Sequence, residues 1–182
     1  MLNVAVLVGS LRRDSSNRKF AKALEKLAAG KLSFVYPNLD LPLYNEDLWE
    51  NPLPDVMALK EAVESADGVL FVTPEYNRSL PPVIKNAIDW GSRPWGQNSW
   101  DGKPVGIVGL SPGAIGTAAA QVHLRSIMPT QGAIVLGKPE VYFSQPGLIE
   151  EDGTIDSDET AAFLTSYIDA LARFIEQVRP KG

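Results

Sequence analysis

The sequence predicts a three-layer α/β fold built on a five-stranded parallel sheet, and two observations lead to this prediction. Short β-branched apolar runs alternate with longer segments of helical apolar spacing, and the alternation occurs five times along the 182 residues. The short runs are apolar at nearly every position, as expected for strands that are covered on both faces. Strict alternation of this kind places the strands parallel, with helices on both sides of the sheet.

The elements can be placed in chain order. Strands are expected at residues 4–8, 32–36, 68–73, 104–110 and 133–136. The first, second and closing helices are marked by apolar residues at helical spacing, namely Phe20, Leu24 and Leu27, then Val56, Leu59 and Val63, and finally Leu164, Ile168, Leu171, Ile175 and Val178. The third and fourth helices are expected at residues 82–90 and 115–128. Proline is tolerated in the first turn of the third helix.

The number of strands favours one strand order. Five parallel strands joined by right-handed crossovers favour a flavodoxin-like fold, with order 2-1-3-4-5, over a six-stranded dinucleotide fold. No internal repeat, low-complexity tract or linker interrupts the alternation. We therefore expect residues 1–182 to form a single domain.

Composition excludes several classes of function. The chain has no cysteine, which excludes disulfides and thiolate metal sites. Its one histidine, His123, excludes sites rich in histidine, so no metal site is expected. A net charge of −5 argues against a nucleic-acid partner. No apolar run approaches the roughly 18 residues of a membrane span. The absence of a secretory signal indicates a cytoplasmic location.

The predicted strand order also indicates where a ligand binds. In such a sheet, ligands bind beyond the carboxyl ends of the strands, near the point where the strand order reverses. Here that point lies between the first and third strands. Three unusual loops converge on it, at residues 9–17, 73–80 and 110–116. We therefore expect these loops to form a binding site.

The first loop, GSLRRDSSNR, is rich in hydrogen-bond donors. It offers hydroxyls, an amide and a guanidinium group, at Ser10, Ser15, Ser16, Asn17 and either Arg12 or Arg13. Free N–H groups at the start of the next helix add donors and a favourable dipole. The loop lacks both GxGxxG and GxxxxGK[ST], so it suits a single terminal phosphate better than a pyrophosphate. Alternatively, Ser15 or Ser16 only caps the helix and the arginines are solvated.

The second loop, TPEYNRSLPP, suits a flat ligand. Pro74 fixes a turn, Tyr76 offers an aromatic face, and Asn77 tolerates unusual backbone angles. Together with Glu75, these residues can lie along a ring and offer backbone groups to its polar edge. The alternative is an ordinary turn with Tyr76 packed at the surface.

The third loop, GLSPGAIG, matches the G-x-S-x-G elbow of serine hydrolases around Ser111. Such an enzyme needs a histidine after the acidic member of its triad, whereas the only histidine, His123, lies twelve residues beyond Ser111. We therefore reject the hydrolase interpretation. The glycines of this loop, Gly113 among them, more plausibly let the backbone approach a ligand closely. We interpret His123 as a hydrogen-bonded helix residue or an interface contact.

Taken together, GSLRRDSSNR, TPEYNRSLPPVIKNAIDW and SPGAIGTAAAQVHLR resemble the NADPH-dependent FMN reductase family, and within it the bacterial quinone and chromate reductases. The resemblance runs over nearly the whole chain. It implies a flavodoxin-like domain that binds FMN non-covalently. By this resemblance the phosphate is held by Ser10, Arg12, Ser15, Ser16 and Asn17, the isoalloxazine ring is lined by Pro74, Glu75, Tyr76 and Asn77, and the third flavin loop contains Ser111 and Gly113. The chain departs from its relatives at Ser16, where they often carry a bulky apolar residue, and at the variable Arg78.

The resemblance also implies a reaction. Hydride passes from NADPH or NADH to FMN and then to a quinone in a ping-pong cycle, with chromate, nitro and azo compounds as further acceptors. The flavin carries the chemistry, so no catalytic side chain is expected. A homodimer or homotetramer is implied, with residues 85–90 and the Trp-rich loop 90–101 as candidate interface. The tryptophans could also be a substrate wall or core. The alternative functions are a flavodoxin-type one-electron carrier and a non-enzymatic flavin-binding module.

Overall fold

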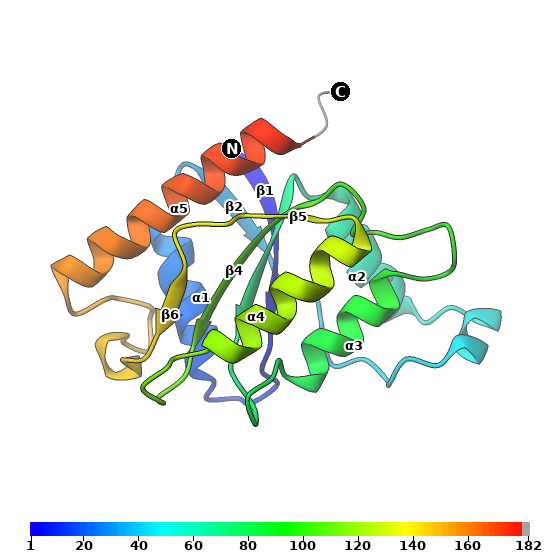
Figure 1. Cartoon of the computed structure of the whole chain (residues 1–182), viewed down its shortest axis with the longest axis horizontal. Helices are drawn as coiled ribbons and strands as arrows, with labels where there is room; N and C mark the ends of the chain where they lie inside the picture. The colour runs from blue at the N-terminus through cyan, green and yellow to red at the C-terminus, as the bar shows by residue number, and fades with distance from the viewer. Residues whose placement is uncertain (180–182) are drawn as a thin grey trace.

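The computed structural model describes residues 1–179 and confirms the three-layer α/β fold (Figure 1). Its strands are β1 (Leu2–Val8), β2 (Leu32–Val35), β3 (Gly68–Thr73), β4 (Pro104–Leu110), β5 (Ile134–Val135) and β6 (Val141–Phe143). Its helices are α1 (Ser16–Leu27), α2 (Pro54–Ser65), α3 (Pro82–Gly91), α4 (Ala118–Ile127) and α5 (Asp158–Val178). Short 3-10 segments lie at Glu46–Glu50, Met128–Gln131 and Pro146–Leu148.

The sheet has the predicted strand order and one additional strand. All strands are parallel, in the order β2-β1-β3-β4-β5. β5 pairs with the beginning of β4, and β6 pairs with its end. The strand expected at residues 133–136 therefore has only two residues, and the fifth position is completed by β6. The interruption contains Gly137 and Pro139, and proline has no N–H to donate to a sheet ladder.

The fourth helix is shorter than the expected range of residues 115–128. Gly116 has a φ of 59°, in the left-handed region that a right-handed helix cannot contain, so α4 begins only after it. At its other end, α4 runs into the 3-10 segment Met128–Gln131.

Two apolar layers hold the helices on the sheet. Val6 and Val72 pack in the layer that includes α1 and α5. Leu7, Phe71 and Ile107 pack in the layer on the opposite face, which includes α2, α3 and α4. Adjacent strand residues such as Val6 and Leu7 thus belong to opposite layers, as the alternation of side chains along a strand requires.

The tryptophans divide between core and surface. Trp90 and Trp100 are fully buried, and their indole N–H groups donate to backbone carbonyls at 2.8 and 2.9 Å. Trp95, from the same segment of chain, is 87% exposed. The Trp-rich loop is therefore anchored in the core by Trp90 and Trp100, while Trp95 is exposed.

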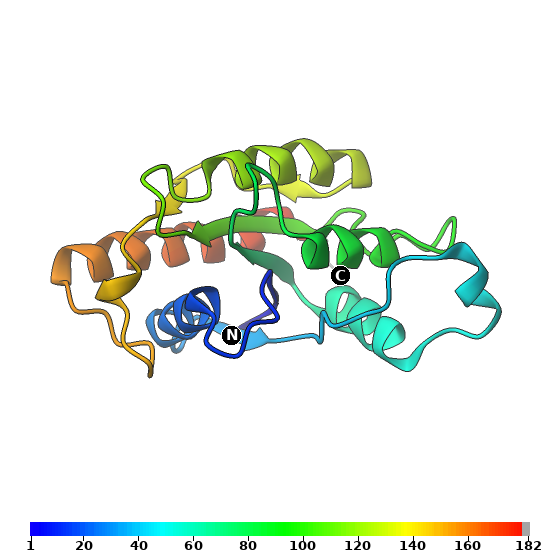
Figure 2. The ribbon, with the colours of Figure 1, turned by 90° about the horizontal axis from the view of Figure 1, so that it is seen from below.

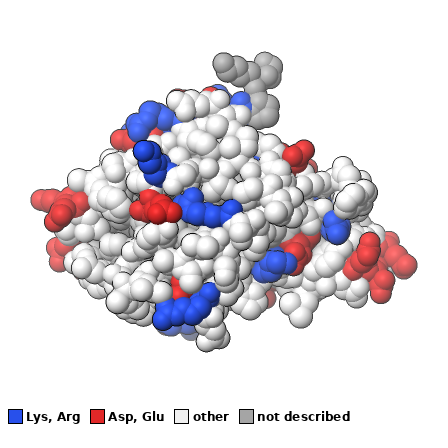
Figure 3. Space-filling model, viewed as in Figure 1, with Lys and Arg blue, Asp and Glu red and all other residues white. Residues whose placement is uncertain are grey.

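The topology brings three loops to one edge of the sheet. The carboxyl ends of β1, β3 and β4 lie at the lower edge in Figure 1, and Figure 2 views the loops that follow them from below. The face shown in Figure 3 carries acidic and basic side chains interspersed rather than one continuous basic area. Within residues 1–179, every helix is too short or too polar to cross a membrane.

Candidate functional site

A cavity of about 140 Å³ lies where the three loops meet, between the ends of β1, β3 and β4. Its lining consists of Ser10, Arg12, Ser15, Ser16, Asn17, Pro74, Glu75, Tyr76, Leu110, Ser111 and Pro112. The structure therefore brings together all of the predicted site residues except Asn77 and Gly113. These two lie in the same loops but outside the lining. The cavity is at the reversal of strand order, where ligands of such sheets bind.

The amino end of α1 supplies donors to this cavity. Ser15 is the N-cap, and its hydroxyl accepts a hydrogen bond from the N–H of Arg18 at 3.4 Å. The N–H groups of Ser16 and Asn17 belong to the first turn and have no partner within the helix. The first turn contains no acidic residue, so the positive end of the helix dipole is not neutralised there. Such a helix end is suited to an anion.

Asn17 joins the first loop to the third. Its side chain is buried, its Nδ2 donates to the carbonyl of Leu110 at 2.8 Å, and its Oδ1 accepts from the N–H of Leu110 at 3.1 Å. Both ends of the side-chain amide are thus used to position β4 against α1. The backbone N–H of Asn17 is what remains available to a ligand.

Arg12 is the basic residue of the cavity lining. Its guanidinium group donates to the carbonyl of Asp14 at 2.9 Å, which folds the side chain over its own loop. The neighbouring Arg13 is exposed and does not line the cavity. The residues of the loop alone left the choice between the two arginines open, the family resemblance implied Arg12, and the structure places Arg12 at the cavity.

The second loop closes as a tight turn beside the cavity. Tyr76 and Ser79 exchange two backbone hydrogen bonds, each of 3.0 Å. Between them, Asn77 and Arg78 have φ values of 50° and 66°, the pattern of a type I′ turn. The predicted tolerance of Asn77 for unusual backbone angles agrees with this conformation. Asn77 thus shapes the turn, while Tyr76 is left half-exposed at the rim of the cavity.

Glu75 holds the second loop against α4. Its side chain is nearly buried, and its Oε2 accepts from the N–H groups of Ala119 at 2.9 Å and Ala120 at 3.1 Å. Thr117, the N-cap of α4, contributes no side-chain hydrogen bond, so the carboxylate of Glu75 caps the helix instead. Sequence reasoning missed this role, because no local motif signals a cap supplied from 44 residues away.

Ser111 and His123 do not form a catalytic pair. The hydroxyl of Ser111 accepts from the N–H of Gly113 at 3.4 Å, a bond within the third loop. The Nδ1 atom of His123 lies 2.9 Å from Oγ of Ser79. The imidazole therefore links α4 to the second loop, as the side chain of Glu75 also does. The hydrolase interpretation has no structural support.

Comparison with known proteins decides the family. The model of a family described as NADPH-dependent FMN reductase matches residues 2–147. The chain belongs to this family. A member from Burkholderia sp., named 2-hydroxy-1,4-benzoquinone reductase, is 46% identical over 181 residues and covers 98% of both chains. A quinone reductase of Pseudomonas putida is 43% identical over 176 residues, which is 96% of this chain and 95% of that protein.

A solved structure agrees with the assignment to the FMN reductase family. FerB, a flavoenzyme NAD(P)H:(acceptor) oxidoreductase from Paracoccus denitrificans, is 46% identical and superposes with a TM-score of 0.96. The similarity covers 99% of this chain and 100% of FerB. The described residues thus have the fold of a flavodoxin-like oxidoreductase.

The donors of the cavity fit the phosphate end of FMN. The lining offers four serine hydroxyls, the free N–H groups of the first turn of α1 and one guanidinium group. Its single acidic member, Glu75, has its charge balanced by the N–H groups at the start of α4. A phosphate monoester, dianionic near neutral pH, is the ligand for which such charge-assisted donors are suited. Within residues 1–179, no three His, Asp or Glu side chains gather as they would around a metal ion.

Proposed function

We propose that this chain is an FMN-dependent NAD(P)H:quinone reductase. The observation that carries the proposal is the cavity at the reversal of strand order, where free helix N–H groups, serine hydroxyls and Arg12 converge. The proposal is supported by relatives of full length whose names are 2-hydroxy-1,4-benzoquinone reductase and quinone reductase.

The residues of the three loops have distinct roles in this proposal. The FMN phosphate is bound by the hydroxyls of Ser10, Ser15 and Ser16, the backbone N–H of Asn17 and the guanidinium group of Arg12. Pro74 and Tyr76 of the second loop, which line the cavity, would hold the flavin ring. Ser111 and Gly113 shape the third loop. FMN held there would supply hydride transfer from NADPH or NADH to the acceptor.

The protein contributes rigidity rather than a catalytic acid or base. The side-chain amide of Asn17 fixes the first loop to the third. Glu75 and His123 fix the second loop to α4 through separate contacts. These contacts hold the cofactor-binding loops in place before the ligand arrives, which lowers the entropy lost on binding. Quinones are the proposed acceptors, with chromate, nitro and azo compounds as further candidates.

We also propose that the protein assembles as a homodimer or homotetramer and works in the cytoplasm. The support for assembly is Trp95, which is 87% exposed on the 90–101 loop and lies 5.5 Å from the guanidinium of Arg93. A large exposed aromatic side chain of this kind is typical of an interface. Sedimentation of the purified protein tests the proposal, and a monomer at micromolar concentration would contradict it.

The reductase function is tested by anaerobic NADPH oxidation with 1,4-benzoquinone and no other protein. We expect turnover, with one quinone reduced for each NADPH oxidised. A one-electron carrier of the flavodoxin type would hold FMN but would not oxidise NADPH without a partner reductase. A flavin-binding module without enzymatic function would show no turnover with any quinone, and either result would overturn the proposal.

A further inference from the structure

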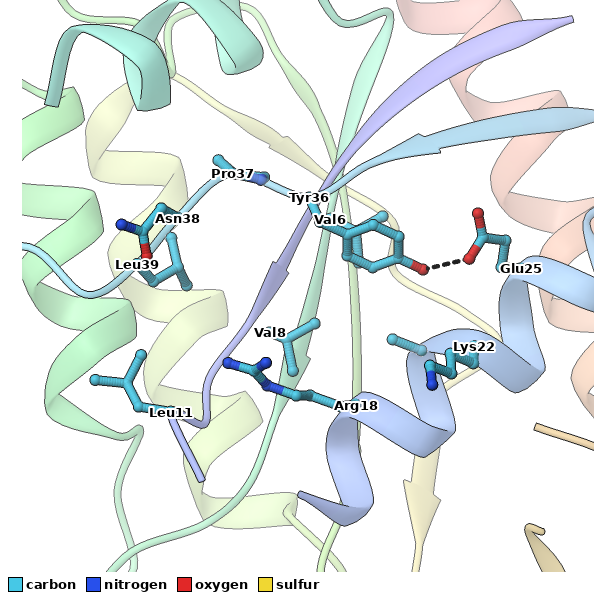
Figure 4. Close-up of a pocket in the computed structure, with 11 residues that line it drawn as sticks. Val6, Val8, Leu11, Arg18, Lys22, Glu25, Tyr36, Pro37, Asn38 and Leu39 are labelled. Atoms are coloured by element: carbon cyan, nitrogen blue, oxygen red, sulfur yellow. Dashed lines mark hydrogen bonds between the residues drawn. The ribbon is translucent and has the colours of Figure 1, made fainter. Parts of the chain in front are cut away.

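A second cavity, of about 410 Å³, opens between β1, α1 and the chain that leaves β2 (Figure 4). It shares no lining residue with the first cavity. The first loop separates the two, since Leu11 lines the second cavity and Arg12 lines the first. The volume is within the range of roughly 300–1,000 Å³ that is typical of small-molecule sites.

The cavity exists because β2 ends early. β1 and β2 are paired from Leu2 with Leu32 to Ala5 with Val35. The next bond of a parallel ladder would need an N–H at position 37, which is proline and has none. β1 continues to Val8, so its last residues have no strand beside them on this side. The cavity occupies the space that a longer β2 would fill.

One part of the cavity lining is apolar and partly flat. It includes the aliphatic residues Val6, Val8 and Leu39. The ring of Tyr36 stands beside them, and its hydroxyl donates to a carboxylate oxygen of Glu25 at 2.9 Å (Figure 4). Partial burial and the Glu25 carboxylate raise the pKa of Tyr36, so the phenol keeps its proton at neutral pH. A flat apolar body therefore suits this part of the cavity.

Two basic side chains of α1, Arg18 and Lys22, also line the cavity, one helical turn apart on the same face. Among residues 1–179, no carboxylate forms an ion pair with either of them, and Arg18 uses only its Nε, which donates to the carbonyl of Ser10 at 3.3 Å. The other lysines of the helix, Lys19 and Lys26, pair with carboxylates of the segment before α5. Within the described residues, the cavity lining thus holds two unpaired cations and one carboxylate, that of Glu25, which accepts the hydrogen bond of Tyr36, so one positive charge remains in excess.

We propose that this cavity is a second ligand site for a small amphipathic anion, a flat ring that bears a phosphate or carboxylate group. The ring lies between Tyr36 and the aliphatic wall, and the anionic group is bound by Arg18 and Lys22. Two sources share this chemistry: the adenosine 2′-phosphate part of NADPH and a free aromatic carboxylate. Because Arg18 also bonds the carbonyl of Ser10, a ligand that engages Arg18 acts on a loop that lines the first cavity.

The test is calorimetric titration of FMN-saturated protein with two probes, adenosine 2′-monophosphate and 2-naphthoate. Saturation with FMN keeps the probes out of the first cavity. We expect at least one probe to bind with one site per chain. The double variant Arg18→Gln/Lys22→Gln should weaken binding by about tenfold or more, as expected when two charged hydrogen-bond donors are removed.

The matched control is Lys19→Gln/Lys26→Gln, which removes the same charge from the same helix but away from the cavity. The affinity of this control variant for the probes should stay within about twofold of that of the wild type, because exposed charges at a distance are largely screened by salt. Binding of adenosine 2′-monophosphate alone would assign the site to the nucleotide, and binding of 2-naphthoate alone would assign it to a free aromatic anion. Both results support the proposal.

The proposal is overturned if neither probe binds, or if both double variants weaken binding equally. This outcome is distinguishable from failure of the proposed function, because FMN binding and NADPH oxidation are measured separately. An FMN-saturated protein that bound a probe through Arg18 and Lys22 but did not oxidise NADPH would support this proposal and contradict the proposed function.

Discussion

At the scale of single residues, Arg12 is the only basic side chain among residues 1–179 that lines the first cavity. We expect Arg12→Ala to weaken FMN binding by roughly 1.5–3 kcal/mol, the contribution of a hydrogen bond to a charged group. Titration of FMN fluorescence measures the effect. Arg13→Ala is the matched control, because Arg13 is the adjacent exposed arginine that does not line the cavity. Equal affinities of the two variants would remove Arg12 from the phosphate site.

Glu75 is expected to contribute to stability through the helix that it caps. Glu75→Gln removes a negative charge from the amino end of α4 while keeping an acceptor near the N–H groups of Ala119 and Ala120. The cost should be roughly 0.5–2 kcal/mol of unfolding free energy. Urea denaturation measures it, with the exposed Glu176→Gln as control. A variant as stable as that control would show that the cap contributes nothing.

The sequence predicted which residues gather at the first cavity but not what each of them contacts. Ser10, Ser15 and Arg12 could be predicted because strand order alone brings their loop to the reversal point. The turn at Asn77 could be predicted from the tolerance of asparagine for the left-handed region. The contacts of Asn17 and Glu75 could not, because both depend on partners brought close only by tertiary structure.

At the scale of elements, the link between α1 and β4 depends on one buried amide. Asn17→Ala would leave the N–H and C=O of Leu110 without partners in a buried position. Each such group costs roughly 1–3 kcal/mol. We expect a clear loss of stability in urea denaturation, larger than that of the exposed Asn51→Ala. Equal effects of the two substitutions would contradict the role of Asn17 as a clamp.

The sequence predicted long elements better than short ones. β1, β3 and β4 are central strands covered on both faces, so nearly all of their residues are apolar, and such runs indicate strands clearly. β5 and β6 have two and three residues, too few for periodicity to indicate a strand. The start of α4 was placed too early, because the helical spacing of its apolar residues extends into a turn that Gly116 makes left-handed.

At the scale of the whole molecule, Asp67 ties β1 to the end of α5. Its carboxylate accepts from the N–H of Asn3 at 2.8 Å and pairs with Arg179. Burial alone would raise the pKa of Asp67, but these two partners outweigh it and lower the pKa below its usual value. A carboxyl group with a lowered pKa in the folded state stabilises the protein above its unfolded-state pKa, and this contribution is lost as the pH falls through the lower value.

Asp67→Asn should therefore be less stable than the wild type at pH 7, and the difference should shrink below about pH 4, where the carboxyl group of the unfolded chain is protonated. Urea denaturation at pH 7 and pH 3 measures both differences. A difference in unfolding free energy that stayed constant between the two pH values would contradict this account of Asp67.

The whole-molecule architecture could be predicted because five alternating units permit few topologies. The second cavity could not. Its shape depends on β2 ending before Pro37, and its charge depends on which basic side chains of α1 form ion pairs. The spacing of apolar residues in the sequence indicates neither of these.

The central claim is that the three loops hold FMN, and the most direct measurement is the visible spectrum of the purified protein, with the released chromophore identified. We expect the bands of oxidised flavin, recovery of FMN after denaturation, and bleaching on anaerobic addition of NADPH that 1,4-benzoquinone reverses. A colourless protein that also failed to bind added FMN would contradict the account.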